Sequence, residues 1–153
     1  QHELSINSSE TGWHRLVAAG EVGRGKRVVV EVTTVDTIVG EAPVDVVKID
    51  VEGHEGAVVT GMAQTLADNP GITVILEHSP AQARLAGLDP LAPVTLLHQA
   101  GLRHTYVVRE DKAVLEKIDV ESLRSRDVKT GRSVNLVMRA QPWPADSAVP
   151  VVS

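Results

Sequence analysis

Residues 44–55 read Val-Asp-Val-Val-Lys-Ile-Asp-Val-Glu-Gly-His-Glu, and they carry the strongest indication of the fold class. Residues 44–51 carry valine or isoleucine on both faces of an extended chain, which is typical of a central strand covered by helices on both sides. From His54 to Asp68 the apolar residues recur at helical spacing, and Asn69-Pro70-Gly71 supplies a stop signal. The pattern therefore predicts a buried strand followed by a helix, the repeating unit of an α/β sheet.

The same alternation continues along the chain. The expected strands lie at residues 27–32, 72–77, 103–108 and 134–139, and the expected helices at residues 33–39 and 94–100. A polar connection covers residues 78–93, and a charged segment covers residues 109–132. We therefore expect an α/β fold with a mainly parallel sheet flanked by helices, followed by a Pro-rich tail over residues 141–153.

The composition narrows the classes of function. The chain has 153 residues, 42% of them hydrophobic and 23% charged, as in one ordinary globular domain. Only Trp13, Tyr106 and Trp143 are aromatic and the net charge is −5, so both base stacking and phosphate contacts disfavour a nucleic-acid partner. The absence of cysteine excludes disulfides, thiolate nucleophiles and cysteine-ligated metals, and it agrees with a cytoplasmic protein. No apolar run approaches the roughly 18 to 20 residues of a membrane-spanning helix, so we expect no membrane partner.

Carboxylates and histidines gather at the ends of two predicted strands. They are Asp50, Glu52, His54 and Glu55 at the end of the first strand, and Glu77 and His78 at the end of the second. The carboxyl ends of neighbouring parallel strands meet at one edge of a sheet, where α/β proteins bind their ligands. We therefore expect both groups to lie in one shared cleft.

Purely structural roles would also explain some of these residues. Asp50 could cap the following helix, Glu55 could complement the positive end of the helix dipole, and Lys48 could pair with Asp50 along one strand face. His98 and His104 are more typical of partly buried, hydrogen-bonded rings than of ligands. Two polar groups at adjacent strand ends nevertheless favour a site.

Residues 44–55 resemble the signature of FkbM-type methyltransferases, a family that uses S-adenosylmethionine. The stretch is followed by Val59-x-Gly61-Met62, which continues the resemblance. Thr34-Val35-Asp36 is similar to the family's Thr-Leu-Asp element, and Ile75-Leu76-Glu77-His78 is similar to the end of its next strand. His54 departs from the pattern, because small residues are more usual at this position, so a role for its imidazole is not inherited.

The resemblance implies a Rossmann-like fold and the methylation of a hydroxyl group on a small molecule such as a sugar, a polyketide or a similar natural product. Such a transfer needs a hydroxyl in line with the sulfonium methyl group and a group that accepts the hydroxyl proton. The candidates are Asp50, Glu52 and His54 for catalysis, Glu55, Glu77 and His78 for binding the acceptor, and Asp50 and Gly53 for binding the cofactor.

Two elements of such a fold are not visible in the sequence. They are the glycine-rich loop that follows the first strand and the acidic residue that ends the second. The glycine-dense run at residues 20–25 is expected to be an ordinary loop. We therefore expect residues 1–140 to form the C-terminal portion of a methyltransferase domain, inactive alone, that pairs with a missing N-terminal half or with a second copy of itself.

Two other classes of function stay open. The first is a divalent-metal module, because carboxylate and imidazole groups suit such ions, although the spacing is not that of a recognised metal loop. Its ligands would come from Asp50, Glu52, His54, Glu55 and His78. The second is a non-catalytic methyltransferase remnant that acts as an interaction domain. Trp13, next to His14, could contact an acceptor or simply pack against its neighbours.

Overall fold

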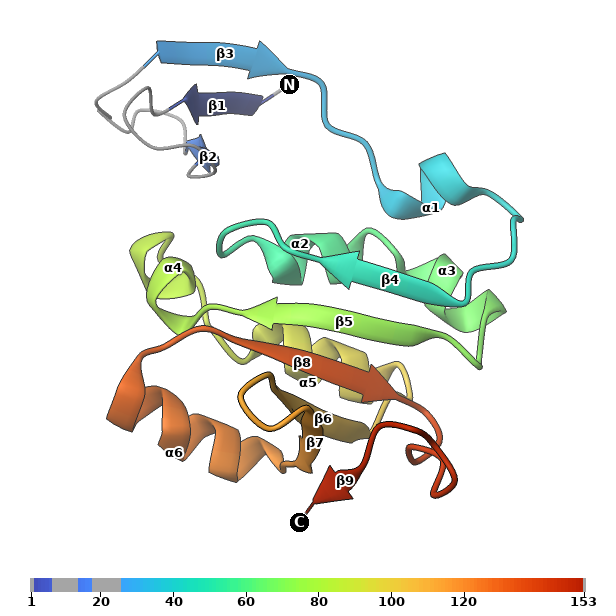
Figure 1. Cartoon of the computed structure of the whole chain (residues 1–153). Coiled ribbons are helices and arrows are strands. Elements are labelled where there is room, and N and C mark those ends of the chain that lie inside the picture. The colour runs from blue at the N-terminus through green and yellow to red at the C-terminus, as the bar shows by residue number, and fades with distance from the viewer. Residues whose placement is uncertain (1, 7–13, 18–25, 153) are drawn as a thin grey trace. The chain divides into compact units, whose positions relative to one another are not determined.

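The computed structural model describes residues 2–6, 14–17 and 26–152 (Figure 1). The chain divides into two compact units, residues 1–34 and residues 35–153. Among the described residues, no helix combines the length and the apolar character that crossing a membrane requires.

The first unit is a small antiparallel sheet in the order β2-β1-β3. Its strands are β1 (His2–Ile6), β2 (His14–Val17) and β3 (Lys26–Val30). β3 confirms the strand that the β-branched run predicted at residues 27–32. Trp13 and the glycine-dense run at residues 20–25 lie outside the described residues.

The second unit contains a six-stranded sheet in the order β4-β5-β8-β6-β7-β9. Its strands are β4 (Val46–Ile49), β5 (Thr73–His78), β6 (His104–Arg109), β7 (Val114–Lys117), β8 (Val134–Arg139) and β9 (Val151–Val152). β4 and β5 run parallel, as expected, but β8 is antiparallel to both of its neighbours, β5 and β6. The expectation of a mainly parallel sheet was therefore wrong, and the sheet is mixed. The β6–β7 hairpin reverses the chain, and the helix that follows then brings β8 in along the direction of β7.

β4 forms one edge of this sheet, with β5 as its only partner among the described strands. The apolar residues on both of its faces had predicted a central strand under helices on both sides. That prediction was wrong, because Val46 is 57% exposed while Ile49 is buried in the core. The residue pattern indicates what each face contacts, but it holds no information about whether a second strand pairs alongside.

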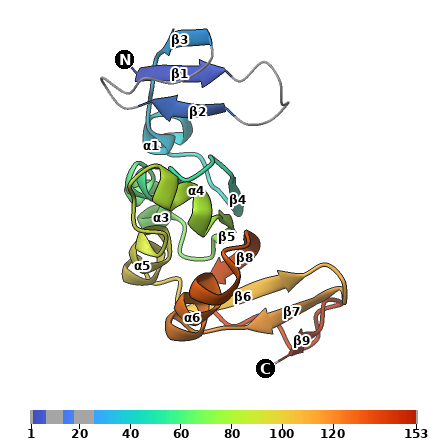
Figure 2. The same cartoon turned by 90° about the vertical axis from the view of Figure 1, so that its left-hand side faces the viewer.

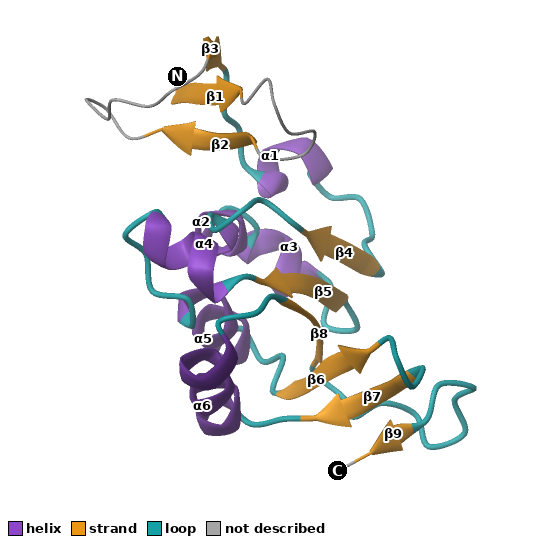
Figure 3. Ribbon diagram, turned by 60° about the vertical axis from the view of Figure 1, so that its left-hand side comes forward, coloured by secondary structure: helices purple, strands orange, loops and turns teal. Residues whose placement is uncertain are grey.

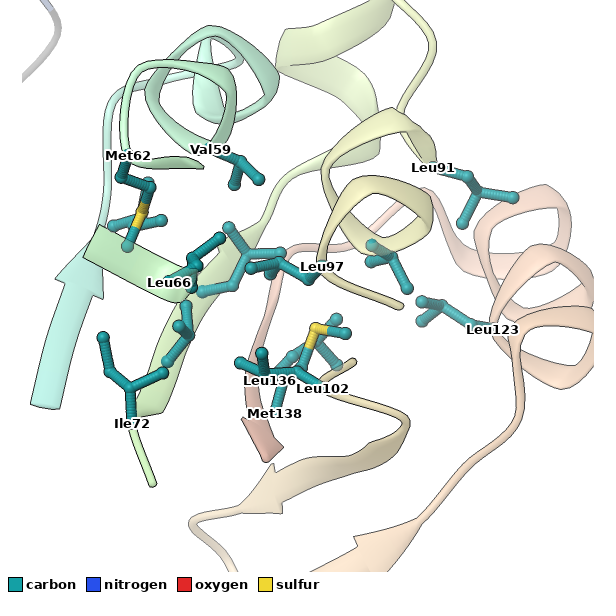
Figure 4. Close-up of a cluster of buried hydrophobic side chains, with 14 of the residues drawn as sticks. Val59, Met62, Leu66, Ile72, Leu91, Leu97, Leu102, Leu123, Leu136 and Met138 are labelled. Carbon is teal, nitrogen blue, oxygen red and sulfur yellow. The ribbon is translucent and has the colours of Figure 1, made fainter. Parts of the chain in front are cut away.

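The helices of the second unit gather on one side of the sheet (Figure 3). They are α1 (Val35–Val39), α2 (Glu55–Thr60), α3 (Ala63–Asp68), α4 (Pro80–Leu85), α5 (Ala92–Gln99) and α6 (Val120–Thr130). One core joins them to the sheet (Figure 4); it includes Met62 from the turn between α2 and α3, Leu97 from α5, Leu123 from α6, and Leu136 and Met138 from β8. Because all five side chains are fully buried, this helix-covered face provides most of the apolar burial that stabilises the unit.

The helix expected over residues 54–68 is broken into α2 and α3. Gly61 ends α2, and its carbonyl accepts a hydrogen bond from the backbone N–H of Asp36. The Asp36 carboxylate in turn accepts from the backbone N–H groups of Gln64 and Thr65, at 3.1 Å and 2.8 Å, and from the Thr65 hydroxyl. These bonds lower the pKa of Asp36, the Thr65 hydroxyl having the largest effect. A residue distant in sequence thus caps the start of α3, which the local pattern could not reveal.

Two segments read as connections contain regular structure. The polar connection at residues 78–93 includes α4, and the charged segment at residues 109–132 includes β7 and α6. Asp119 caps α6 by accepting a hydrogen bond from the Ser122 N–H at 2.7 Å.

The Pro-rich segment at residues 141–153, expected to be a tail, contributes to the fold. β9 pairs in parallel with β7, as Figure 2 shows at the lower edge of the sheet. The backbone N–H of Trp143 donates to the Tyr106 hydroxyl at 2.9 Å, and the two rings meet edge to face. Trp143 therefore covers part of the sheet face that faces away from the helices.

Candidate functional site

Three carboxylates converge at the carboxyl ends of β4 and β5. The parallel register pairs Ile49 with Leu76, so the residues that follow, Asp50 and Glu77, stand side by side. Oxygen atoms of Asp50, Glu52 and Glu77 all lie within 4.8 Å of one another. This confirms the expected meeting of the two strand ends for these three residues.

The carboxylates of this cluster differ in how readily they ionise. The Lys48 ammonium lies 2.6 Å from the Asp50 carboxylate, and this hydrogen bond holds the pKa of Asp50 below its usual range. A hydrogen bond with Asp50, reinforced by burial, raises the pKa of Glu77 from 4.5 to about 7. Burial and the neighbouring charge of Asp50 also raise the pKa of Glu52. The site thus holds one firmly ionised carboxylate beside another that exchanges its proton near neutral pH.

The backbone that carries the cluster takes an unusual turn. Glu52 has a φ of 53° and Gly53 a φ of 99°, both in the left-handed region. A Cβ atom on Gly53 would lie 2.8 Å and 2.9 Å from the backbone carbon and oxygen of Gln82 in α4. Only glycine fits there, and the left-handed backbone at a non-glycine residue is a feature that concentrates at functional sites.

Glu55 and His54 do not belong to the carboxylate cluster. Glu55 is buried in the first turn of α2, and its carboxylate accepts a hydrogen bond from the Gly53 N–H at 2.9 Å. It therefore fixes the turn as well as complementing the helix dipole. His54 occupies the N-cap position without a side-chain capping bond, and its Nδ1 is buried with no hydrogen-bond partner among the described residues.

His78 points away from the cluster. Its side chain alternates with that of Glu77 along β5 and lies on the helix-covered face, where Nε2 is 2.8 Å from the carboxylate of Asp127 in α6. The exposed fractions of the two side chains are 1% and 4%. Asp127 was not among the expected site residues, because it lies in a charged segment 49 positions later and no local pattern connects it to His78.

A cavity of about 270 Å³ lies on the helix-covered side of the sheet. It lies between α2, α4 and α5, and its lining includes Gly53, Glu55, Glu77 and His78. The expectation that both residue groups share one cleft was therefore wrong, because the side chains of Glu77 and His78 leave β5 on opposite faces and neither Asp50 nor Glu52 lines this cavity.

The carboxylate cluster is suited to a positively charged group. One cation could contact oxygens of all three residues at the observed spacing. The wider ligand set that a metal module would need does not assemble, because Glu55 is bonded to Gly53 and His78 to Asp127. His98, which was expected to be a hydrogen-bonded ring rather than a ligand, lies away from the site, and its Nε2 is 2.9 Å from the Thr105 hydroxyl.

Comparison with known proteins gives the family. The model of the methyltransferase FkbM domain matches residues 3–106, which is more than half of the chain and includes β4, β5 and all three carboxylates of the cluster. No curated protein and no solved structure matches the chain. Because the matched range covers more than half of the chain, the chain belongs to the FkbM methyltransferase domain family.

Proposed function

We propose that this chain serves the S-adenosylmethionine-dependent methylation of a hydroxyl group on a small molecule. The observation that carries the proposal is the convergence of Asp50, Glu52 and Glu77 at two strand ends, in a member of a methyltransferase family. Ligands of open α/β sheets bind beyond the carboxyl ends of the strands, which is where these carboxylates lie.

The cluster fits the methionine end of the cofactor. S-adenosylmethionine would supply an electrophilic methyl group on a positively charged sulfur atom. Asp50 is ionised at neutral pH, and Lys48 lowers its pKa further, so it can attract a sulfonium or ammonium group. Gly53 belongs to the left-handed turn that carries the cluster. We propose that these residues orient the cofactor's cationic end.

The same cluster offers a group that can accept the proton of the acceptor hydroxyl. A general base works best when its pKa lies near the operating pH, and the pKa of Glu77 is about 7. We propose Glu77 for this step, with Asp50 and Glu52 positioning the reacting groups. His54 is a weaker candidate, because its Nδ1 is buried beside no described partner.

Residues 1–140 are proposed to form the C-terminal portion of the methyltransferase domain. What supports this is that neither a glycine-rich loop after a first strand nor an acidic residue after a second is visible in the sequence. The adenosine end of the cofactor would then be held by residues outside this chain.

Amide substitutions in the full-length protein test the proposed roles. Asp50→Asn, Glu52→Gln and Glu77→Gln keep the side-chain volume but remove charge and basicity. We expect the variant that removes the proton acceptor to lower kcat by about 10²- to 10⁴-fold, with melting little changed. The matched control is Asp45→Asn, an exposed residue just before β4. If all three variants turn over normally, the carboxylates are not catalytic and the proton acceptor must be sought at His54 or His78.

A further inference from the structure

The cavity between α2, α4 and α5 is a hollow apart from the carboxylate cluster. Its volume is about 270 Å³, whereas voids in close-packed protein interiors rarely exceed the size of a water molecule. Neither Asp50 nor Glu52 lines it, and the side chain of Glu77, which does line it, leaves β5 on the opposite face. A ligand in this cavity would therefore contact side chains that the proposed methyl transfer does not use.

The lining contains a deeply buried carboxylate, that of Glu55, which is 3% exposed. One of its oxygens accepts from the Gly53 N–H at 2.9 Å, and the start of α2 offsets part of its negative charge. The other oxygen has no hydrogen-bond partner among the described residues, yet protein atoms do not enclose it fully, so a ligand can reach it. None of the ion pairs in the described part of the chain includes Glu55. Because a buried charge without a counter-charge is costly, Glu55 would gain from a positively charged ligand.

Other polar groups of the lining are also hydrogen-bond acceptors. Asp89 is exposed, and its Oδ1 accepts from the Leu91 N–H at 3.0 Å, which leaves Oδ2 free to accept. The Asp127 carboxylate can only accept, so Nε2 of His78 carries the proton toward it, and Nδ1 of the neutral ring is an acceptor. Among the described residues that line the cavity, none is Lys or Arg. The lining therefore combines acceptors with negative charge.

The rest of the lining is largely apolar. Leu88, Pro90, Ala92, Pro93 and Leu96 contribute to the wall. Such a wall favours a ligand that buries hydrocarbon. Leu88 is 45% exposed, so this apolar surface is open to a molecule that enters.

We propose that the cavity is a binding site for a small primary ammonium compound with an apolar body, and that its ammonium group contacts the Glu55 carboxylate. An ammonium group has three donors and no acceptor, which suits a lining of acceptors. A charged hydrogen bond to a buried carboxylate is also stronger than the bond that a neutral hydroxyl would make. This site is additional to the proposed methyl transfer and does not depend on it.

The test compares two probes on the 153-residue chain at neutral pH, without cofactor. Cyclohexylammonium and cyclohexanol have the same ring, and they differ in carrying an ammonium group or a hydroxyl group. Nuclear magnetic resonance of methyl-labelled leucine reports binding at Leu88 and Leu96, which line the cavity. We expect cyclohexylammonium to shift both resonances in a saturable way, and cyclohexanol to bind roughly tenfold more weakly or not at all.

An amide variant with a matched control identifies the group that binds the cation. Glu55→Gln keeps an oxygen that can accept from the Gly53 N–H but removes the charge. It should weaken cyclohexylammonium binding by roughly tenfold or more. Glu110→Gln removes the same charge from an exposed residue outside the cavity lining and should bind the probe as the parent does.

A second variant covers the case in which Glu55→Gln does not melt cooperatively. Asp89→Asn alters an exposed residue of the lining and keeps the oxygen that accepts from the Leu91 N–H. It should weaken cyclohexylammonium binding by roughly twofold to fivefold, the smaller effect expected of an exposed charge.

Three results would overturn the inference. They are cyclohexanol binding as tight as that of cyclohexylammonium, no saturable shift of Leu88 and Leu96 with cyclohexylammonium, and folded Glu55→Gln and Asp89→Asn variants that bind it as the parent does. Because no cofactor is present, these results do not depend on methyl transfer. Failure of the proposed function would instead appear in the turnover of the variants Asp50→Asn, Glu52→Gln and Glu77→Gln.

Discussion

Glu77 should make the stability of the protein depend on pH. Its pKa is about 7 in the folded chain, against an ordinary value of 4.5, so the folded state binds more protons than the unfolded state between these values. The free energy of unfolding should therefore fall as the pH rises from 4.5 to about 7, and change no further through this group above that. Glu77→Gln removes the ionisation and should flatten this fall.

Thermal unfolding at several pH values between 5 and 8 measures the effect. Relative to the parent, Glu77→Gln should gain melting temperature at pH 8 and little at pH 5. Glu110→Gln, an exposed glutamate just after β6, is the control and should follow the parent curve. If the melting temperatures of Glu77→Gln and the parent change with pH in parallel, folding does not raise the pKa of Glu77 and the prediction is wrong.

The buried His78–Asp127 pair should contribute far more to stability than a surface pair of the same helix. Asp127→Ala leaves the buried imidazole of His78 without its hydrogen-bond partner, which typically costs about 1 to 3 kcal/mol. Arg124 and Glu121, also in α6, are 3.7 Å apart and well exposed. Arg124→Ala should change the free energy of unfolding by less than about 0.5 kcal/mol. Urea unfolding compares the two, and equal losses would contradict this ranking.

At the scale of the elements, Gly53 fixes how the turn after β4 meets α4. Gly53→Ala combines an unfavourable left-handed backbone with a contact of 2.8 Å to Gln82 that neither backbone can relieve easily. Gly87 also has a positive φ, of 73°, but a Cβ there meets nothing within 4 Å. Gly87→Ala should therefore cost only the backbone term, about 1 kcal/mol, and Gly53→Ala clearly more. Denaturant unfolding checks this, and equal costs would mean that α4 shifts freely.

Local sequence patterns predicted the elements better than their arrangement. The strands at β5, β6 and β8 follow from short β-branched runs, because alternation along a strand reflects the faces it buries. Lateral neighbours leave no such trace, which is why β4 was expected at the centre and Val46 proved exposed. The break between α2 and α3 depends on Asp36, whose contribution comes from tertiary structure.

In the candidate site, too, some features were predictable from the sequence and others depend on tertiary structure. Asp50, Glu52 and Glu77 were predictable as neighbours, because each lies at or just after the end of a strand and these parallel strands end together. The different environments of Glu77 and His78 follow from strand alternation, but the partner of His78 depends on where α6 docks. Asp127 could not be chosen from its neighbours, since α6 is rich in charged residues of similar appearance.

At the scale of the whole molecule, the 153-residue chain alone should bind S-adenosylmethionine weakly or not at all. The cluster can hold only the cationic end of the cofactor, and the glycine-rich loop and ribose-binding acid are not visible in the sequence. Isothermal titration calorimetry should show no affinity in the micromolar range, that is, nothing near about −8 kcal/mol. A micromolar Kd would contradict the proposed division of the domain.

The position of β8 between β5 and β6 has a consequence for folding during synthesis on the ribosome. Synthesis delivers β5 and β6 first, yet the two never touch in the sheet, since β8 lies between them and pairs with both. Until residues 134–139 have emerged, β5 and β6 carry unpaired backbone edges and the apolar side chains of their buried face. We therefore expect the nascent chain to expose these edges to chaperones and to aggregation until β8 has been synthesised. The sheet then forms late in translation, through contacts between residues distant in sequence, and such contacts form slowly.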